Sequence, residues 1–586
     1  MNIQIQITGW AEATDEPLVS TSFGSRERSP HQFLFNRLAK AIPRAVPAFF
    51  ALLLLALPAV AQAQFGYTTN NGAITITGYT GPGGAVTIPS AINGLPVTRI
   101  GDKAFYYCSS LTSVAIPNSV TSIGDFAFWE CRGLTSVTIP NSVISIGDFA
   151  FADSSLFNVT IGNSVTSIGD EAFEDCHSLT SVTIGNSVTN IGGSAFYLCS
   201  RLTNAIIGNS VTSIGDGAFG ICSNLTVITV DTNNPAYSSV NGVLFDKSQT
   251  TLVQYPGGLG GSYAIPDSVT SIGYGAFAWT GLTSVTIGNS VTSIGDSAFS
   301  NCSNLTNAII GNSVTSIGDG AFGICSNLTG VTFPDSVTII GYDAFFGCSS
   351  LTNVTIGDSL ASIGNGAFAG CFKLTEITVD TNNPVYSSVN GVLFDKSQTT
   401  LVAYPGGLGG SYTIPDSVTS IGDTAFWECS SLTNVTIGNG VTHIGDAAFE
   451  DCESLISVYF KGNAPTADEA ISYGSLFDSD DATAYYLPGT TGWDYFSANT
   501  GIPAVLWFLP NPLILNSSPG FGVQTNRFGF IISWATNTPV VVEACANLFH
   551  PAWIPVGTNT LTGGSSYFSD PQWTNHPARF YRLRAP

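Results

Sequence analysis

The chain has 586 residues, of which only 10% are charged, and its formal net charge is −23. This length exceeds what one ordinary hydrophobic core organises, so several domains or a repeat array are expected. The negative charge argues against nucleic acid or an anionic membrane surface as a partner, because both repel an acidic protein. It fits either a cationic partner or the solubility that a long β-rich surface needs.

Residues 1–63 have the pattern of a secretory signal peptide with an extended n-region. A basic stretch ending at Arg44 precedes the apolar run 46–60, and small residues up to Ala63 form a signal-peptidase type of site. The run is shorter than the roughly 20 residues that a membrane-spanning helix needs. We therefore expect a mature chain that starts at Gln64, has no membrane span, and is extracellular or at the cell surface.

A single sequence motif recurs through residues 64–457. One copy, residues 134–151, reads LTSVTIPNSVISIGDFAF, and its final Ala-Phe step returns every 22 or 23 residues, with two gaps of 58. This period is typical of leucine-rich repeats, in which stacked coils bury a core that no single coil buries alone. The marker phenylalanines are Phe105, Phe128, Phe151, Phe173, Phe196, Phe219, Phe277, Phe299, Phe322, Phe345, Phe368, Phe426 and Phe449.

The motif also predicts the path of one coil. In Leu-Thr-Ser-Val-Thr-Ile, the Leu, Val and Ile side chains point inward and the Ser and Thr outward, which predicts a half-buried strand. Pro or Gly ends that strand, and Ser-Val-x-x-Ile-Gly adds two inward residues on the return path. The next residue, Asp, is placed to cap a short helical turn over the buried Ala and Phe. We therefore predict a β-rich leucine-rich-repeat solenoid with short helical turns on its convex side.

The two gaps hold long-coil inserts, at about 230–262 and 379–411. Residues 230–273 and 379–422 lie 149 positions apart and are nearly identical, which indicates a recent duplication of a block. In each insert, two strand-forming runs flank Lys-Ser-Gln-Thr, so we predict a hairpin that projects from or extends one edge of the array. The differences between the copies are Ala236/Val385, Gln254/Ala403 and Ala264/Thr413.

Two motifs resemble the BspA-type leucine-rich repeats of bacterial surface proteins. They are Ile-Gly-Asp-x-Ala-Phe-x-x-Cys-x-x-Leu-Thr-x-Val and the insert sequence Asn-Pro-x-Tyr-Ser-Ser-x-Asn-Gly-Val-Leu-Phe-x-Lys. The resemblance covers roughly residues 74–460, and the many copies make it specific. It implies an exported protein whose relatives include adhesins that bind host or extracellular matrix proteins and mediate cell–cell contact.

The repeat pattern breaks near Val458. Residues 458–509 are expected to form the closing cap that a solenoid needs over its last apolar face, and 510–519 a linker. Residues 520–586 alternate strand-like segments with polar turns, which predicts a small β-sandwich. This module resembles the fibronectin type III-like modules that end many secreted bacterial proteins, and it is either an attachment module or a spacer.

Eleven of the twelve cysteines lie three residues after a marker phenylalanine. A disulfide ladder is one interpretation, but stacked positions about 4.8 Å apart with parallel side chains fit disulfide geometry poorly. Ser154 and Thr280 take the same slot in two coils, so we expect buried free thiols. A zinc site has little support because the chain has no CxxC pair.

The Asp after Ile-Gly forms a second ladder along the coils. A row of carboxylates is one way to hold calcium, but helix capping and turn formation explain the position more simply. Catalytic motifs are missing: the sequence has no GxSxG, HExxH or GxxxxGK[ST], and His177, His443, His550 and His576 are scattered. We therefore expect neither an enzyme nor a bound cofactor or metal.

The outward strand positions are the candidate ligand face. Ser, Thr and Asn side chains in a regular strip can hydrogen-bond a glycan or a protein backbone. The alternative is that they are solvated, β-favouring residues without a partner. The candidates are Ser136, Thr138, Ser181, Thr183, Ser284, Thr286, Asn353, Thr355, Asn434 and Thr436.

These patterns predict a secreted or cell-surface binding protein, adhesin-like, whose partner is an extracellular protein or glycan. The alternative is a structural protein that self-associates into a surface layer or matrix. A less favoured interpretation is a secreted polysaccharide-active enzyme with its chemistry in the inserts or the C-terminal module.

Overall fold

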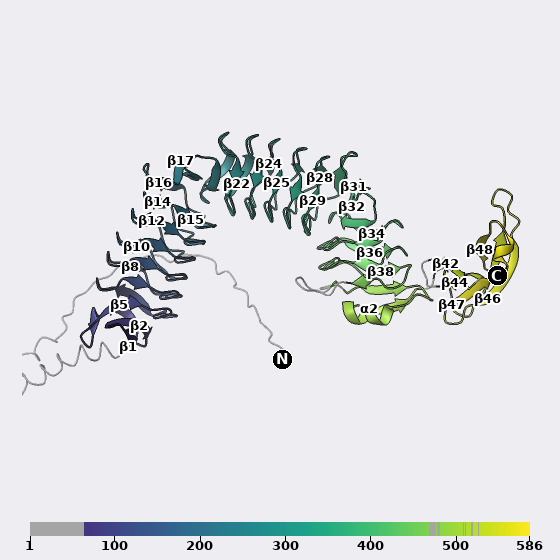
Figure 1. Cartoon of the computed structure of the whole chain (residues 1–586), viewed down its shortest axis with the longest axis horizontal. Helices are drawn as coiled ribbons and strands as arrows, with labels where there is room; N and C mark the ends of the chain where they lie inside the picture. The colour runs from purple at the N-terminus through teal and green to yellow at the C-terminus, as the bar shows by residue number, and fades with distance from the viewer. Residues whose placement is uncertain are drawn as a thin grey trace, which may run out of the picture. The chain divides into compact units, whose positions relative to one another are not determined.

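A computed structural model of the chain describes residues 64–585, except 468–475, 478–480, 508, 510, 517–519 and 526. The predicted signal peptide at 1–63, and part of the predicted linker, lie outside the described residues. From Gln64 onward, short strands stack coil upon coil (Figure 1).

The stack begins with a hairpin. Strands β1 (Phe65–Asn70) and β2 (Ala73–Tyr79) are antiparallel and joined by an Asn-Gly turn. β2 then pairs in parallel with β5 (Leu95–Ile100), to which the short β4 (Ala91–Ile92) is antiparallel. β1 and β2 therefore cover the open edge of the first coil.

The first side of each coil is a strand that is half buried, as the alternation predicts. In β8, Ser136 and Thr138 are exposed and Val137 is buried, and β8 pairs in register with the strands of the coils before and after it. These strands are β3 (Gly84–Thr87), β6 (Leu111–Ala115), β8 (Ser136–Thr138), β10 (Asn158–Thr160), β12 (Ser181–Ile184), β14 (Asn204–Ile207), β16 (Val227–Val230), β20 (Gly260–Ala264), β22 (Gly281–Thr286), β24 (Asn307–Ile309), β26 (Val331–Thr332), β28 (Asn353–Ile356), β30 (Glu376–Val379), β34 (Gly410–Thr413), β36 (Leu432–Ile437) and β38 (Ser457–Phe460).

The second side is a two-residue strand from the Ser-Val-x-x-Ile-Gly segment, which buries its Ile. Successive copies again pair in parallel, so the coils share a second ladder, which the two inserts divide into three sheets. These strands are β7 (Ser122–Ile123), β9 (Ser145–Ile146), β11 (Ser167–Ile168), β13 (Asn190–Ile191), β15 (Ser213–Ile214), β21 (Ser271–Ile272), β23 (Ser293–Ile294), β25 (Ser316–Ile317), β27 (Ile339–Ile340), β29 (Ser362–Ile363), β35 (Ser420–Ile421), β37 (His443–Ile444) and β39 (Thr466–Ala467).

The third side consists of turns, and the prediction of a short helical turn there is wrong. The N–H groups of Lys103 and Tyr107 donate to carbonyls of the next coil, at 2.9 and 3.0 Å, whereas that of Tyr106 bonds three residues back within its own coil. Lys103 and Tyr107 have φ of 58° and 59°. Two left-handed residues four positions apart frame each turn, and every second N–H points to a neighbouring coil, which is incompatible with an α-helix.

Where a turn has the Asp, its carboxylate typically bridges coils and does not cap a helix, which corrects the second expectation for this segment. Asp125 Oδ1 accepts the Asp148 N–H at 3.0 Å, and Asp148 Oδ1 accepts the Asp170 N–H at 2.9 Å. The carboxylate therefore satisfies a backbone donor that the non-helical turn leaves pointing at the next coil.

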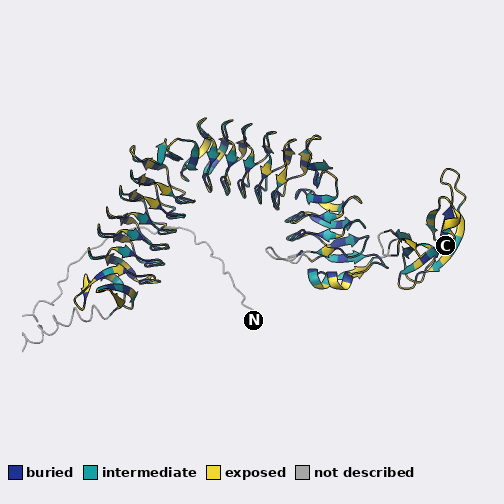
Figure 2. Cartoon of the chain, in the orientation of Figure 1, coloured by how far each residue is buried: buried dark blue, intermediate teal, exposed yellow. Residues whose placement is uncertain are grey.

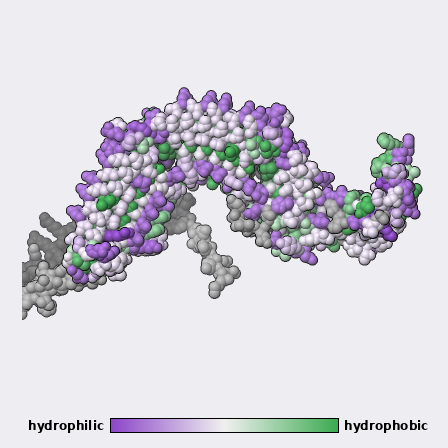
Figure 3. Space-filling view, in the orientation of Figure 1, coloured by the Kyte–Doolittle hydropathy of each residue, from purple (hydrophilic) through white to green (hydrophobic). Residues whose placement is uncertain are grey.

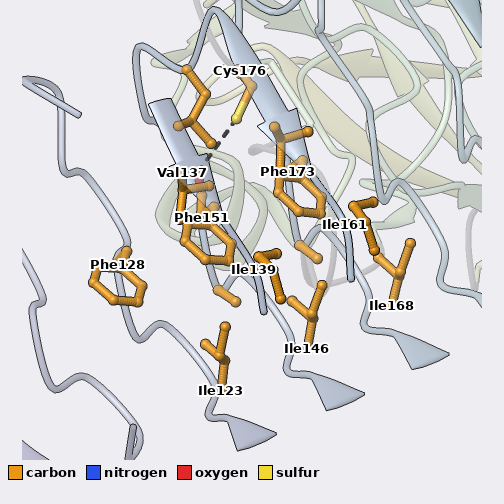
Figure 4. Close-up of a cluster of buried hydrophobic side chains, with 14 of the residues drawn as sticks. Ile123, Phe128, Val137, Ile139, Ile146, Phe151, Ile161, Ile168, Phe173 and Cys176 are labelled. Carbon is orange, nitrogen blue, oxygen red and sulfur yellow. Dashed lines mark hydrogen bonds between the residues drawn. The ribbon is translucent and has the colours of Figure 1, made fainter. Parts of the chain in front are cut away.

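Columns of identical side chains fill the core. Phe151 stacks between Phe128 and Phe173, with ring centroids 5.0 and 5.3 Å apart, and an isoleucine column runs beside them (Figure 4). Figure 2 shows buried residues along the inside of every coil. The buried residues of the solenoid form three clusters, which meet at the two inserts. Each coil is thus buried by its neighbours, as the repeat pattern predicts.

Each insert forms two hairpins where the sequence predicted one. β17 (Tyr237–Val240), β18 (Val243–Asp246) and β19 (Thr251–Gln254) form an antiparallel meander, and β19 pairs in parallel with β21. Asn241 and Gly242, with φ of 52° and 84°, make the first turn. The prediction of one hairpin with its turn at Lys-Ser-Gln-Thr had placed both residues inside a strand. The second insert repeats this arrangement with β31 (Tyr386–Val389), β32 (Val392–Asp395) and β33 (Thr400–Ala403).

Beyond β38 the coils become irregular. β40 (Thr483–Tyr486) and β41 (Ala504–Leu506) extend the last parallel sheet. Within the described residues, the only α-helix is α2 (Trp493–Thr500), whose Trp493 and Phe496 rings lie 4.9 and 5.4 Å from that of Phe460. The helix therefore covers apolar side chains at this end of the stack.

The C-terminal module has two antiparallel sheets that share buried residues such as Phe530, Val542 and Phe568. Its resemblance to a fibronectin type III-like sandwich stays a prediction. Its elements are β42 (Leu513–Leu515), β43 (Gly522–Gln524), β44 (Arg527–Ser533), β45 (Pro539–Cys545), β46 (Ile554–Thr560), β47 (Ser565–Asp570), the short 3-10 helix η1 (Trp573–Asn575) and β48 (Phe580–Arg584).

Candidate ligand-binding face

The half-buried strands place the candidate side chains in columns that run from coil to coil. Ser136 lies between Ser113 and Asn158 in the register, and Thr138 lies beside Thr160. Parallel pairing of identical segments produces this alignment, because each outward position meets its own equivalent in the next coil. The columns together form the strand face of the solenoid.

The ten predicted residues all lie on the strand face, but they differ in exposure. Thr138, Thr183 and Thr355 represent the exposed group, whereas Asn434 and Thr436 are half-buried because Tyr459 of the next coil lies opposite Thr436. Ser284 is also half-buried and donates to Ser262 Oγ at 2.7 Å. The exposed members are Ser136, Thr138, Ser181, Thr183, Thr286, Asn353 and Thr355.

A hollow interrupts the strand face just before the first insert. It has a volume of about 570 Å³, and Thr183, Ile206, Thr229 and Asp231 are among the residues that line it. The Ile206 side chain is 39% exposed, so it supplies an apolar surface between polar neighbours. Of the ten predicted residues, Thr183 is the one that lines this hollow.

Asparagines of successive coils form the rim of the hollow. Asn163 and Asn186 both line it, and Asn186 Oδ1 accepts the Asn209 N–H of the next coil at 3.1 Å. This bond fixes the side-chain amide in one orientation. Asp231 and these asparagines were not predicted, because the hollow is lined by residues of several successive coils and no single coil contains it.

Outside the hollow, the surface of the solenoid is mixed in character. Figure 3 shows mainly neutral and hydrophilic surface on the face in view, with small hydrophobic patches. On the strand face, Ile309 is 53% exposed beside Thr286 in the register. Such single apolar residues do not form the large continuous patch that marks an obligate interface.

The cysteine three residues after a marker phenylalanine has a structural role. Cys131 Sγ lies 3.1 Å from the Phe105 carbonyl oxygen and donates to it, and the same contact recurs between later coils. Burial raises the pKa of Cys131 and of Cys348 to about 12. These thiols stay protonated at neutral pH, so they are poor nucleophiles and poor metal ligands.

The prediction that the four histidines are scattered is wrong for two of them. His177 and His443 lie on different coils, but His550 and His576 both line a cavity of about 280 Å³ in the C-terminal module, together with Arg579. The side chain of Arg579 is 8% exposed and its Nε lies 2.7 Å from Asp570 Oδ2. This ion pair neutralises the buried guanidinium, which is consistent with a structural role.

The repeat sequence identifies the family of the chain. The pattern described as a BspA type leucine rich repeat region matches residues 98–256, 261–375, 317–399 and 410–475, which is more than half of the chain. The chain belongs to the BspA-type leucine-rich repeat family. The predicted BspA-type resemblance and the predicted leucine-rich-repeat solenoid are therefore confirmed.

Solved leucine-rich repeat structures resemble this BspA-type chain. A leucine-rich cell surface protein of Faecalibacterium prausnitzii is 33% identical, with 54% of this chain and 93% of that chain covered and a TM-score of 0.45. A leucine-rich repeat protein of Eubacterium ventriosum is 24% identical, with 74% of this chain and 96% of that chain covered and a TM-score of 0.39. The pneumococcal vaccine antigen PcpA is 18% identical, with 76% of this chain and 98% of that chain covered and a TM-score of 0.43. No curated protein matches the chain.

Two further observations concern only the part of the chain that the structure describes. No helix there has the length and apolar character needed to cross a membrane. No three His, Cys, Asp or Glu side chains in the same residues are grouped to hold a metal ion.

Proposed function

We propose that the protein is a secreted or cell-surface binding protein whose strand face holds an extracellular protein or glycan. The observation that carries this proposal is the hollow of about 570 Å³ on that face, where polar side chains surround an apolar floor. A surface role is consistent with the 33% identical protein of known structure, which is described as a leucine rich cell surface protein. Adhesion is our extension of that role.

The chemistry of the hollow favours a ligand rich in hydroxyl or amide groups. Thr183 and Thr229 offer hydroxyls, Asp231 offers a carboxylate, and the fixed amide of Asn186 adds a donor. Ile206 between them suits the apolar face of a sugar ring or a small aliphatic side chain. Concave sites with an apolar base and a few converging polar groups are where small ligands bind with specificity.

The first experiment is a binding screen of the chain from Gln64 against arrays of extracellular proteins and glycans. For a ligand that binds, Asp231→Asn and Thr183→Ala should each weaken binding, by about tenfold where a hydrogen bond to the carboxylate is lost. Thr332→Ala is the matched control, because Thr332 takes the same strand position on β26 and is neither one of the ten predicted residues nor part of the lining of the hollow.

Two outcomes would overturn the proposal. A ligand whose affinity is unchanged by Asp231→Asn and Thr183→Ala would place binding outside the hollow. The absence of any ligand, together with assembly of the protein alone as its concentration rises, would favour the structural surface-layer interpretation.

A further inference from the structure

Five aromatic side chains gather on the turn side of the first coils, away from the strand face. Tyr106 stacks on Trp129 with centroids 4.8 Å apart, and Phe126 stacks on Phe149 at 4.6 Å. Tyr107 meets Trp129 edge-on at 4.9 Å. Tyr107 is 53% exposed and the other four rings are partly exposed. We call these five residues the aromatic turn patch.

The patch is not a requirement of the fold. The equivalent positions of a central coil hold Ser297, Ser300 and Asn301, and that coil forms the same ladder of turns. Clusters of partly exposed aromatic rings are otherwise unfavourable on a soluble surface, and they mark interaction sites.

The protein already places a cation on the patch. The ammonium of Lys103 lies 5.6 Å from the centroid of the Tyr106 ring and 5.4 Å from that of Phe126. These distances are within the range of a cation–π contact, so the patch has ring faces that accept an ammonium group.

Carboxylates continue the turn side immediately beyond the rings. The N–H of Glu130 bonds to Ala152 and that of Asp153 bonds to Glu174, both at 2.9 Å, which brings the acidic residues of successive coils together. Arg132 compensates only part of this charge: its guanidinium pairs with Glu130 at 2.9 Å. The carboxylates are Glu130, Asp153, Glu171, Glu174 and Asp175.

Glu174 shows the repulsion within this group. Burial, a hydrogen bond with Glu171 and the neighbouring carboxylates raise the pKa of Glu174 to about 7. A cation bound beside it would relieve the repulsion between these groups, whereas a neutral sugar would not.

We propose that the aromatic turn patch and its carboxylates bind a lysine- or arginine-rich segment of an extracellular protein. The cationic side chains of the segment lie on the ring faces, as Lys103 does, and pair with the carboxylates of the following coils. A guanidinium or ammonium group gains both from the quadrupole of an aromatic ring and from a nearby carboxylate. This site is on a different side of the coil from the hollow, so it does not depend on the strand face being a binding site.

Charge-neutral substitutions in the patch test the proposal directly. The probes are fluorescent oligo-lysine and oligo-arginine peptides, and binding is measured by anisotropy at low and high salt. Tyr107→Leu should weaken binding about two- to fivefold, because it removes an exposed ring while keeping an apolar side chain, and Tyr107→Phe should bind like the native protein. Asn301→Leu is the matched control at the same position of a central coil.

Charge substitutions separate the site from general attraction to an acidic protein. Glu171→Gln with Glu174→Gln should weaken binding several-fold more than Asp267→Asn with Asp358→Asn, which removes at least as much negative charge elsewhere. Hydrogen exchange of the first coils verifies that the variants are folded.

Three results would overturn the proposal. Equal affinity of Tyr107→Leu, Tyr107→Phe and the native protein would exclude a role for the rings. Binding of neutral oligosaccharides, lost in Tyr107→Leu while the cationic peptides bind unchanged, would assign the patch to a glycan. Assembly of the protein alone that Tyr107→Leu abolishes would assign the patch to a second copy of the chain.

Discussion

The phenylalanine column is expected to stabilise the solenoid through stacking as well as burial, and Phe299 offers the sharpest test. Phe299 is fully buried and stacks on Phe277 at 4.7 Å and on Phe322 at 4.9 Å. Phe299→Leu keeps an apolar side chain and removes both stacked pairs. Each aromatic pair contributes about 0.5–1.5 kcal/mol beyond burial, so the variant should lose about 1–3 kcal/mol. Phe299→Ala adds a cavity and should lose about 3–5 kcal/mol.

The assay is hydrogen exchange of peptides from the coil that carries each substitution and from its neighbours, because stability in a repeat protein is local. Phe157→Leu is the control, since Phe157 is 58% exposed and its substitution should change the opening free energy by about 0.5 kcal/mol or less. Phe368 gives a second comparison: within the described residues it stacks on Phe345 alone, at 5.8 Å, so Phe368→Leu should cost about half as much as Phe299→Leu. Equal opening free energies for Phe299→Leu and Phe157→Leu would refute the stacking argument.

Further predictions concern the backbone, the thiols and one carboxylate. Ile324 has a φ of 58°, whereas Gly347 holds the same position in the next coil. Ile324→Gly should therefore be about 1 kcal/mol more stable in urea unfolding than Ile324→Ala, because both remove the side chain and only Ala keeps a Cβ at positive φ; equal stability of the two variants would contradict this. Iodoacetamide should modify half-exposed Cys108 in the native protein before buried Cys131, as peptide mass mapping would show; simultaneous labelling would contradict it. Burial raises the pKa of Asp246, but hydrogen bonds from Ser248, Thr250 and the Thr251 N–H outweigh it and lower the pKa. The stabilisation by the ionised Asp246 carboxylate is fully present above its unfolded pKa of about 4, and it is lost as the pH falls through the lower pKa of the folded state. Protection of β18 and β19 from hydrogen exchange should therefore weaken in that acidic range in the native protein, and it should weaken less in Asp246→Asn.

The coil could be predicted from the sequence because burial in a repeat depends on position alone. Leu134, Val137 and Ile139 recur with the period of the stack, and the structure buries all three. The outward orientation of Thr138 and its equivalents follows from the same alternation.

The turn could not be predicted in the same way. Asp before x-Ala-Phe satisfies the local rule for a helix cap, but in the structure the Asp125 carboxylate accepts an N–H of the next coil. Local propensity does not include hydrogen bonds that exist only between coils. The two left-handed residues of each turn, such as Lys103 and Tyr107, follow from those bonds. The Asn-Gly signal at 241–242, by contrast, was present in the sequence and predicts a two-residue hairpin turn.

The two proposed surfaces have one physical origin. Three ladders per coil fix the backbone, and the inward Phe, Leu, Val and Ile fix the core, so the outward positions are free to differ between coils. This freedom allows Tyr107 in one coil and Asn301 in another at the same backbone position. It also allows the hollow at Asp231, which is lined by residues of the last coils before the first insert. If the argument is correct, exchanging the outward turn residues of a central coil for those around Tyr107 should transfer binding of cationic peptides without loss of stability. Failure of that transfer in a folded variant would mean that neighbouring coils shape the site as strongly as its own side chains do.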